Sequence, residues 1–269
     1  MLARKFLVPA LIVVPVLAAV AYAVASGKIG GAGNATPSDS NTPSVLRALA
    51  REGLQDLQPF DAGAHVRGYA GRAGQQPVAV YVLPDGSAIV GARISVDGKP
   101  LDDERVSELV AKPMGETLWA KLDASTWVQD GNTDAPRVVY TFSDPNCRYC
   151  HRFWDAARPW VDSGKVQLRH VMVGVIKVDS STKAAAILGA SDRAAALRQH
   201  EREFESGGIK PAPSVPSDIA LRLDANQDLM AELGFRGTPG IVYLDAQGTL
   251  ARVNGMPRPE MLATVLGPR

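Results

Sequence analysis

The sequence predicts two folded units, a small α+β unit followed by a larger mixed α/β unit, behind an amino-terminal targeting segment. Three observations lead to this fold class. The 269 residues suffice for two modest domains. Segments with alternating or helical apolar periodicity are separated by clusters rich in Gly, Pro, Asn and Asp. Hydrophobic residues make up 46% of the chain, enough to build a buried core.

The amino terminus has the pattern of a targeting segment. Arg4 and Lys5 precede an apolar stretch over residues 6–25, and the small residues at its end are typical of a cleavage site. The stretch is also close to the length that spans a bilayer. Residues 1–25 therefore fit either a signal peptide or a retained membrane anchor, and both export the chain to an oxidising compartment. Residues 26–42 are expected to form a flexible tether.

Residues 43–100 are expected to form the small α+β unit. Ser44 is placed to begin a helix that runs through Leu57. Strand-like runs follow at residues 65–69, 78–83 and 87–95. The stretch carries no obvious catalytic set. An accessible sheet edge here would allow pairing with a second copy of the chain, and a simple folded spacer is the alternative.

A linker over residues 101–130, mostly a helix through Trp127 with a break near Pro113, is expected to lead to the larger unit. That unit, residues 131–269, begins with a strand at 137–142 and a helix through about Trp160. The elements that follow are a strand, three helices, a hairpin and a last helix, at residues 166–173, 182–189, 192–204, 217–233, 240–253 and 259–266. This is the order of a thioredoxin-like domain with a helical insertion.

Charge and cysteine content narrow the function. The 29 basic and 28 acidic residues leave a net charge of +1, so no global field attracts nucleic acid. The only two cysteines, Cys147 and Cys150, stand three positions apart. A bridge this short restrains the unfolded chain less than a long one would. Chemistry or metal binding is therefore favoured over a structural role.

The setting of the pair favours thiol chemistry. Cys147 is expected to begin a helix after the turn Asp144-Pro145-Asn146. Free N–H groups and the positive end of the helix dipole favour a thiolate there, and Arg148 adds a positive charge. Both effects lower the pKa of Cys147, which is the expected nucleophile. Cys150 lies one turn further on the same face and is the expected resolving thiol.

The same residues admit other interpretations. Residues 147–151 also spell C-x-x-C-H, the attachment signal for c-type haem, although the strand before it and the α/β order after it disfavour a haem protein. Zinc lacks further ligands at a suitable spacing among the four histidines. His151 lies on the helix face of Cys147. It is either a group that favours the thiolate when protonated or an ordinary half-exposed residue.

Gly237-Thr238-Pro239-Gly240 precedes an apolar strand and forms the second element of the predicted site. An X-Pro bond at a strand entry can be cis. In thioredoxin-like folds this loop faces the cysteine pair, where the backbone of Thr238 would bind an extended substrate by strand addition. An ordinary turn proline is the alternative.

Several runs resemble one known family. The sequence resembles the DsbG branch of the DsbC/DsbG periplasmic disulfide isomerases. The resemblance lies in the stretch from Phe142 to Cys150, Phe153-Trp154, the run from Ala157 to Arg169, residues 173–177 and 184–188, and Thr238-Pro239. The resemblance implies a V-shaped homodimer. Residues 43–100 would be its cystatin-like dimerisation domain, joined by the linker helix to a thioredoxin-like catalytic domain.

The resemblance also implies an activity without a metal or cofactor. The family takes electrons from a DsbD-type membrane reductase. It reduces or isomerises disulfides in oxidised or misfolded periplasmic proteins, and its DsbG branch is associated with reducing sulfenylated cysteines. A dithiol oxidase of the same fold and a chaperone-like binding protein are the other functions that the sequence allows.

This chain departs from the family pattern beside the cysteines. Arg148 stands where DsbG-type sites commonly carry a proline, and Asn146 stands where they carry an aromatic residue. Arg148, Tyr149 and His151 are the residues expected to tune the redox properties. The charge of Arg148 is expected to stabilise the thiolate and make the disulfide more oxidising.

Overall fold

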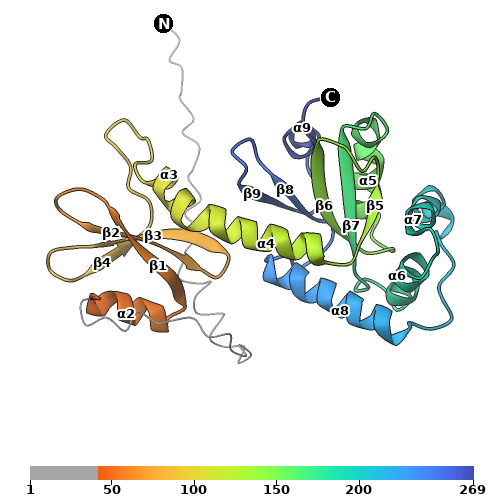
Figure 1. The fold of residues 1–269 in the computed structure, drawn as a ribbon, viewed down its shortest axis with the longest axis horizontal. Helices are drawn as coiled ribbons and strands as arrows, with labels where there is room; N and C mark the ends of the chain where they lie inside the picture. The colour runs from red at the N-terminus through yellow and green to blue at the C-terminus, as the bar shows by residue number, and fades with distance from the viewer. Residues whose placement is uncertain (1–41) are drawn as a thin grey trace, which may run out of the picture. The chain divides into compact units, whose positions relative to one another are not determined.

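The computed structural model describes residues 42–269, which form two compact units that divide between Val106 and Ser107 (Figure 1). The predictions of a signal peptide or anchor at residues 1–25 and of a tether concern residues that, except for residue 42, lie outside this range. Across residues 42–269, none of the helices combines the length and the apolar character needed to cross a membrane.

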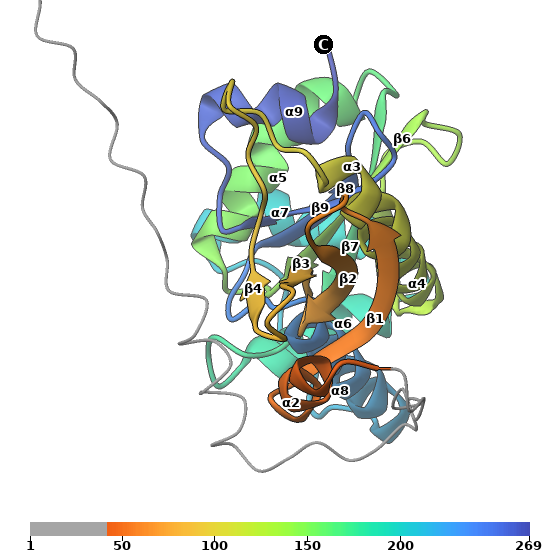
Figure 2. The same cartoon turned by 90° about the vertical axis from the view of Figure 1, so that its left-hand side faces the viewer.

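The first unit is an antiparallel sheet packed against a helix. Its strands lie in the order β1-β2-β3-β4 (Figure 2). Leu46 of the helix packs against Leu54, Val80 and Val82 of the sheet, which places the small core between the two layers. The elements are α2 (Ser44–Arg51), β1 (Leu54–Asp61), β2 (Arg67–Ala73), β3 (Gln76–Val82), β4 (Ala88–Val90) and α3 (Asp103–Val106).

The helix expected to run through Leu57 is wrong beyond Arg51. Gly53 follows the helix with a φ of +98°, a left-handed conformation that commonly ends helices. The chain then pairs with β2 as strand β1. An apolar residue at position 54 fits both a helix and a strand, because in the structure Leu54 packs against Leu46 in the same core. The strand expected at 87–95 is confirmed only over Ala88–Val90.

The predicted linker helix is also only partly correct. A π-helical turn, η1 (Ser107–Ala111), leads into α4 (Lys112–Ala124). Pro113 lies in the first turn of α4, directly after the π-helical turn, so the irregularity in the helix falls where the sequence predicts a break. The helix ends before Trp127, because residues 127–130 form strand β5 (Trp127–Asp130) and pair with β7 (Val166–Met172). An edge strand this short has too little periodicity to be predicted from sequence.

The second unit has the predicted order of strands and helices. Its five-stranded sheet is ordered β5-β7-β6-β8-β9, with β6 parallel to β7 and the other pairs antiparallel. The remaining elements are β6 (Arg137–Ser143), α5 (Arg148–Val161), α6 (Ser180–Leu188), α7 (Arg193–Arg202), η2 (Phe204–Ser206), α8 (Ser217–Glu232), β8 (Gly240–Leu244), β9 (Leu250–Asn254), η3 (Pro259–Met261) and α9 (Leu262–Leu266).

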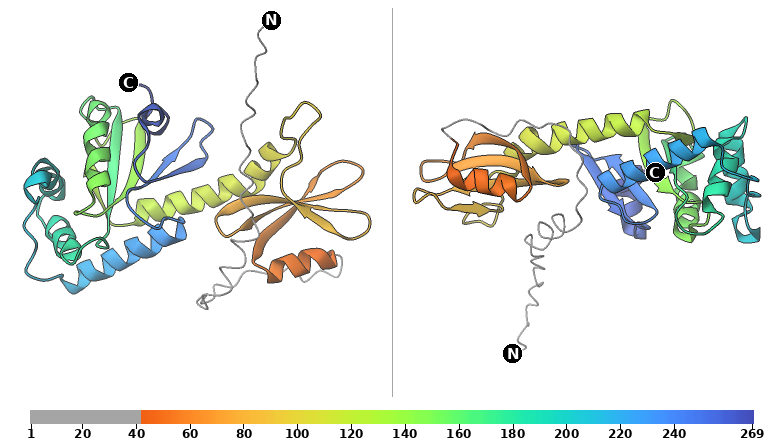
Figure 3. Two further views of the ribbon diagram at one scale, coloured as in Figure 1. Left: turned by 180° about the vertical axis from the view of Figure 1, so that it is seen from behind. Right: turned by 90° about the horizontal axis from the view of Figure 1, so that it is seen from below.

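Helices cover both faces of this sheet. Side chains alternate along β6: Tyr140 and Phe142 face a cluster with α4 and α8, whereas Val139 faces one with α5 and α9. Figures 1 and 3 show α4 and α5 on opposite sides of the strands. Helices α6 and α7 form the insertion between β7 and β8 and pack with α8 in a third cluster. The thioredoxin-like fold with a helical insertion is confirmed.

Candidate active site

The turn between β6 and α5 is held by a buried carboxylate. Asp144 is 2% exposed. Its Oδ1 accepts hydrogen bonds from the Asn146 N–H and the Ser180 hydroxyl, both at 2.8 Å. Its Oδ2 accepts the N–H groups of Val175 at 2.6 Å and Ile176 at 3.0 Å. The turn is therefore fixed to the segment that leads into α6.

Cys147 is the N-cap residue of α5, as the sequence predicts. Its backbone is extended, and its Sγ accepts a hydrogen bond from the Cys150 N–H at 3.0 Å. The two cysteines form a disulfide with Cα atoms 5.2 Å apart, and each residue is 3% exposed. Sγ of Cys147 thus lies at the positive end of the helix dipole, where a negative charge is favoured.

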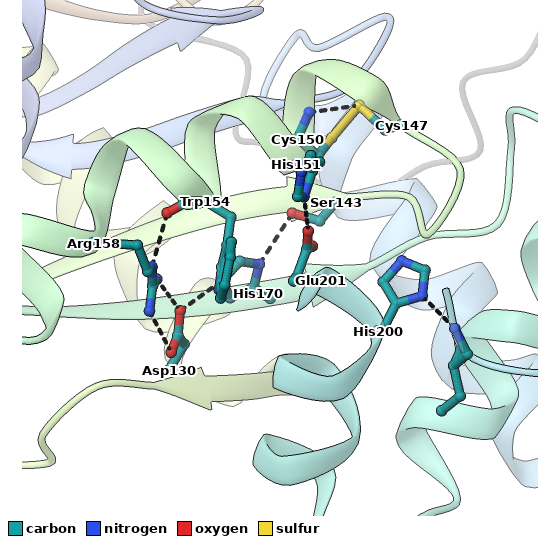
Figure 4. Close-up of polar contacts among 11 residues, drawn as sticks. Asp130, Ser143, Cys147, Cys150, His151, Trp154, Arg158, His170, His200 and Glu201 are labelled. Carbon is teal, nitrogen blue, oxygen red and sulfur yellow. Dashed lines mark hydrogen bonds and ion pairs between the residues drawn. A yellow bond between two sulfur atoms is a disulfide. The ribbon is translucent and has the colours of Figure 1, made fainter. Parts of the chain in front are cut away.

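The residues beside the pair differ in how firmly they are held. Arg148 and Tyr149, between the cysteines, are exposed. His151 is held by the insertion: its Nδ1 lies 2.8 Å from Oε2 of Glu201 in α7 (Figure 4). Its ring stacks on Phe204 of η2, with ring centroids 4.4 Å apart. His151 is therefore partly buried and held in place by Glu201 and Phe204.

A buried polar network lies further along α5 (Figure 4). Ser143 Oγ is 3.3 Å from His170 Nδ1, and His170 Nε2 is 3.7 Å from Asp130 Oδ2. Arg158 forms an ion pair with Asp130 and lies over the Trp154 ring, 4.2 Å from its centroid. Burial alone would raise the pKa of Asp130, but His170 and Arg158 outweigh it and hold this pKa well below its ordinary value. Asp130 is therefore ionised and ties β5 to α5.

His200 is more deeply buried than His151. It is 1% exposed, and burial lowers its pKa although Glu201 opposes the shift. Its Nδ1 accepts the Ile209 N–H at 3.1 Å. His200 is therefore neutral near pH 7 and adds no positive charge to the site.

The Thr238-Pro239 loop lies at the same edge of the sheet as the cysteine turn. Gly240, which begins β8, pairs antiparallel with Phe142 near the end of β6. The residues that precede Gly240 and those that follow β6 therefore leave the sheet together. The Thr238-Pro239 bond is cis. The Thr238 hydroxyl is buried and has no hydrogen-bond partner among the described residues.

The sequence also allowed a metal ion or a c-type haem at the cysteine pair, and the structure shows which side chains would be available to bind each. Over residues 42–269, no group of three or more His, Cys, Asp or Glu side chains is arranged to hold a metal ion. A c-type haem would use both cysteine sulfurs as thioethers, whereas the sulfurs of Cys147 and Cys150 are bonded to each other. The disulfide favours thiol chemistry at this pair.

The sequence did not reveal the charged residues that support the site. Asp130, Lys183 and Glu201 are all buried. In the sequence each looks like an ordinary polar position on a strand end or a helix surface. The partners that bury them lie far along the chain, so no local pattern marks them.

The chain is similar to several known proteins. A family model described as a thioredoxin-like domain matches residues 129–267. The thiol:disulfide interchange protein DsbG of Pseudomonas aeruginosa is 44% identical over 239 residues, covering 88% of this chain and 93% of that protein. DsbG of Escherichia coli is 39% identical over 230 residues, covering 84% and 91%. A solved structure of the catalytic domain of Proteus mirabilis ScsC is 22% identical with a TM-score of 0.47, covering 56% of this chain and 95% of that one.

A cysteine pair bonded at a helix start on this fold exchanges electrons between thiols and disulfides, so the protein is a thiol–disulfide oxidoreductase. More narrowly, the chain belongs to the DsbG family of thiol:disulfide interchange proteins, as the resemblance of its sequence predicted.

Proposed function

We propose that this protein reduces or rearranges incorrect disulfides in periplasmic proteins and reduces their sulfenylated cysteines. Cys147 is the attacking thiol and Cys150 the resolving thiol. The observation that carries the proposal is the hydrogen bond from the Cys150 N–H to Cys147 Sγ. After reduction, this N–H and the helix dipole would stabilise a thiolate on Cys147 and so raise its reactivity near neutral pH.

The exchange has two steps. The Cys147 thiolate attacks one sulfur of a substrate disulfide, a Cys147–substrate bond forms, and the other substrate sulfur leaves as a thiolate. Cys150 then attacks the Cys147 sulfur, releases the substrate thiol and closes the enzyme disulfide. Two electrons pass to the substrate, and a DsbD-type membrane dithiol donor returns two. With a sulfenic acid, the first step releases water instead of a thiol.

The exposed apolar surface beside the cysteine pair supports the proposal that the substrates are proteins. Tyr149 is 54% exposed, and Val175 and Ile176 are each 46% exposed. The N–H groups of Val175 and Ile176 bind Asp144 in the turn before Cys147, so these apolar side chains flank the site. Exposed apolar surface fits the apolar segments of a misfolded protein. Thr238 and Pro239 would bind the extended backbone of that segment.

Trapping with Cys150→Ala tests these roles. The variant cannot resolve the first intermediate, so mixed disulfides between Cys147 and its partners should accumulate when it is expressed in a Gram-negative periplasm. Non-reducing gels and mass spectrometry of the trapped species give the readout. A variant that lacks both cysteines is the matched control. If Cys150→Ala trapped no more partners than that control, the mechanism would be wrong.

We further propose that Arg148, Tyr149 and His151 tune the redox properties of the pair. Arg148→Pro should raise the pKa of Cys147 and make the disulfide less oxidising. The pKa shift should stay below about one unit, because an exposed charge is screened by water and salt. Thiolate absorbance against pH and equilibration with glutathione measure the two quantities. Arg152→Ala, which removes another positive charge from α5, is the control. Alanine is used there because a proline at residue 152 would disrupt the helix. Unchanged values in Arg148→Pro would contradict the role of the charge.

The first unit supports the proposed homodimer. β4 is an edge strand of its sheet and presents Ile89 and Val90, which are 55% and 42% exposed. An exposed apolar edge strand is suited to pairing with a second copy. We propose that residues 43–100 dimerise the protein.

A further inference from the structure

The side chain of Asn146, the residue before the nucleophile, is tied to helix α6. Its Nδ2 donates hydrogen bonds to Asp179 Oδ1 at 2.9 Å and to Ser180 Oγ at 3.0 Å. Its Oδ1 accepts a hydrogen bond from Lys183 Nζ at 3.0 Å. Both ends of the amide are thus engaged by the insertion helix.

Lys183 is an unusual partner because its ammonium group is buried. The residue is 8% exposed, although lysines are rarely buried without a pairing partner. Its Nζ also donates to the Gly207 carbonyl at 2.9 Å and lies 3.4 Å from Asp179 Oδ2. An apolar side chain would fill this position without the cost of desolvating a charge. A packing role alone therefore does not explain a lysine here.

Lys183 brings a positive charge to the turn, where the neighbouring charged groups are the carboxylates of Asp179 and Asp144. Asp179 is its ion-pair partner, and the Asp179 side chain is 43% exposed, so water screens its negative charge more than the buried ammonium. Burial would raise the pKa of Asp179, but Lys183 outweighs it and keeps Asp179 ionised. His200, which faces the same region from α7, is neutral. Asp144 accepts hydrogen bonds from the turn and from Ser180.

We propose that Lys183 is a positioning residue for thiol–disulfide exchange. Through Asn146 it fixes the turn that carries Cys147 and makes the surroundings of the thiolate more positive. This inference rests on the proposed role of Cys147 as nucleophile. It gives a function to the hydrogen bonds of the Asn146 side chain.

The test is the pH dependence of Cys147 alkylation by iodoacetamide in the reduced, full-length protein. Lys183→Met should raise the pKa of Cys147 by about one unit, leaving about tenfold less thiolate at pH values below the pKa. At high pH, the alkylation rate of the variant should approach that of the unchanged protein, because Cys147 is then a thiolate in both. Lys183→Arg should restore most of the original pKa. Lys177→Met, which removes an exposed charge from the same segment, is the matched control and should change nothing.

A double-variant comparison tests the path through Asn146. Asn146→Ala should raise the Cys147 pKa similarly, and adding Lys183→Met should shift it no further. Lys183→Met that lowers thermal stability without moving the Cys147 pKa would overturn the proposal, and so would fully additive shifts. Asn146→Ala serves as the test if Lys183→Met does not fold. If the unchanged protein is not alkylated at Cys147, the proposed function fails. If it is alkylated and the variants match it, only the positioning role fails.

Discussion

Cys147→Ser should abolish both reduction and isomerisation of disulfide-bonded protein substrates, with a loss on the order of 10³-fold or more. A serine hydroxyl is not ionised near neutral pH, and Cys150 is the only other thiol in the chain. Cys150→Ser should behave differently. It should stop net reduction, because the mixed disulfide at Cys147 has no internal thiol to resolve it. It should keep part of the isomerisation, because a substrate thiol can displace Cys147 instead.

Two assays separate these outcomes. Turnover of insulin coupled to a dithiol donor reports reduction, and recovery of activity by scrambled ribonuclease reports isomerisation. Suppression of aggregation, measured in parallel, should survive in Cys147→Ser if the protein also binds unfolded chains. Equal loss of both activities in the two variants would refute the assignment of separate roles. Retention of reduction in Cys147→Ser would reverse the roles.

The sequence predicts the centre of the site because its signals are local. The turn from Asp144 to Asn146 marks the end of a strand and the start of a helix, and so places Cys147 at an N-cap. Thr238-Pro239 is a similar local marker at a strand entry. The residues that support this centre depend on tertiary contacts: His151 meets Glu201, 50 residues away, and Arg158 meets Asp130, 28 residues away. Such pairings carry no periodicity, and strand β5 was missed for the same reason.

The second large effect is expected at the ion pair between α5 and β5. Arg158→Leu removes the ion-pair partner of the Asp130 carboxylate, whose side chain is 2% exposed, and leaves His170 at 3.7 Å beside it. Removing one partner of a buried pair costs about 3–5 kcal/mol of unfolding free energy. The loss of stacking on Trp154 acts in the same direction. Urea unfolding measures the change as a lower midpoint. Arg152→Leu, at an exposed position on the same helix, is the control and should stay within about 0.5 kcal/mol.

The pH dependence of this loss identifies its cause. The pKa of Asp130 is lower in the folded protein than its unfolded value of about 3.9, so the pair stabilises the fold above that pH. The stabilisation disappears only as the pH falls through the lowered folded pKa. In Arg158→Leu, burial raises the Asp130 pKa with less opposition, so the carboxyl is protonated at a higher pH and its unpaired charge is removed. The stability gap between the two proteins should therefore narrow as the pH falls from 7 toward about 3. A gap that stays constant over this range would show that lost packing, rather than the unpaired carboxylate, destabilises the helix that carries Cys147.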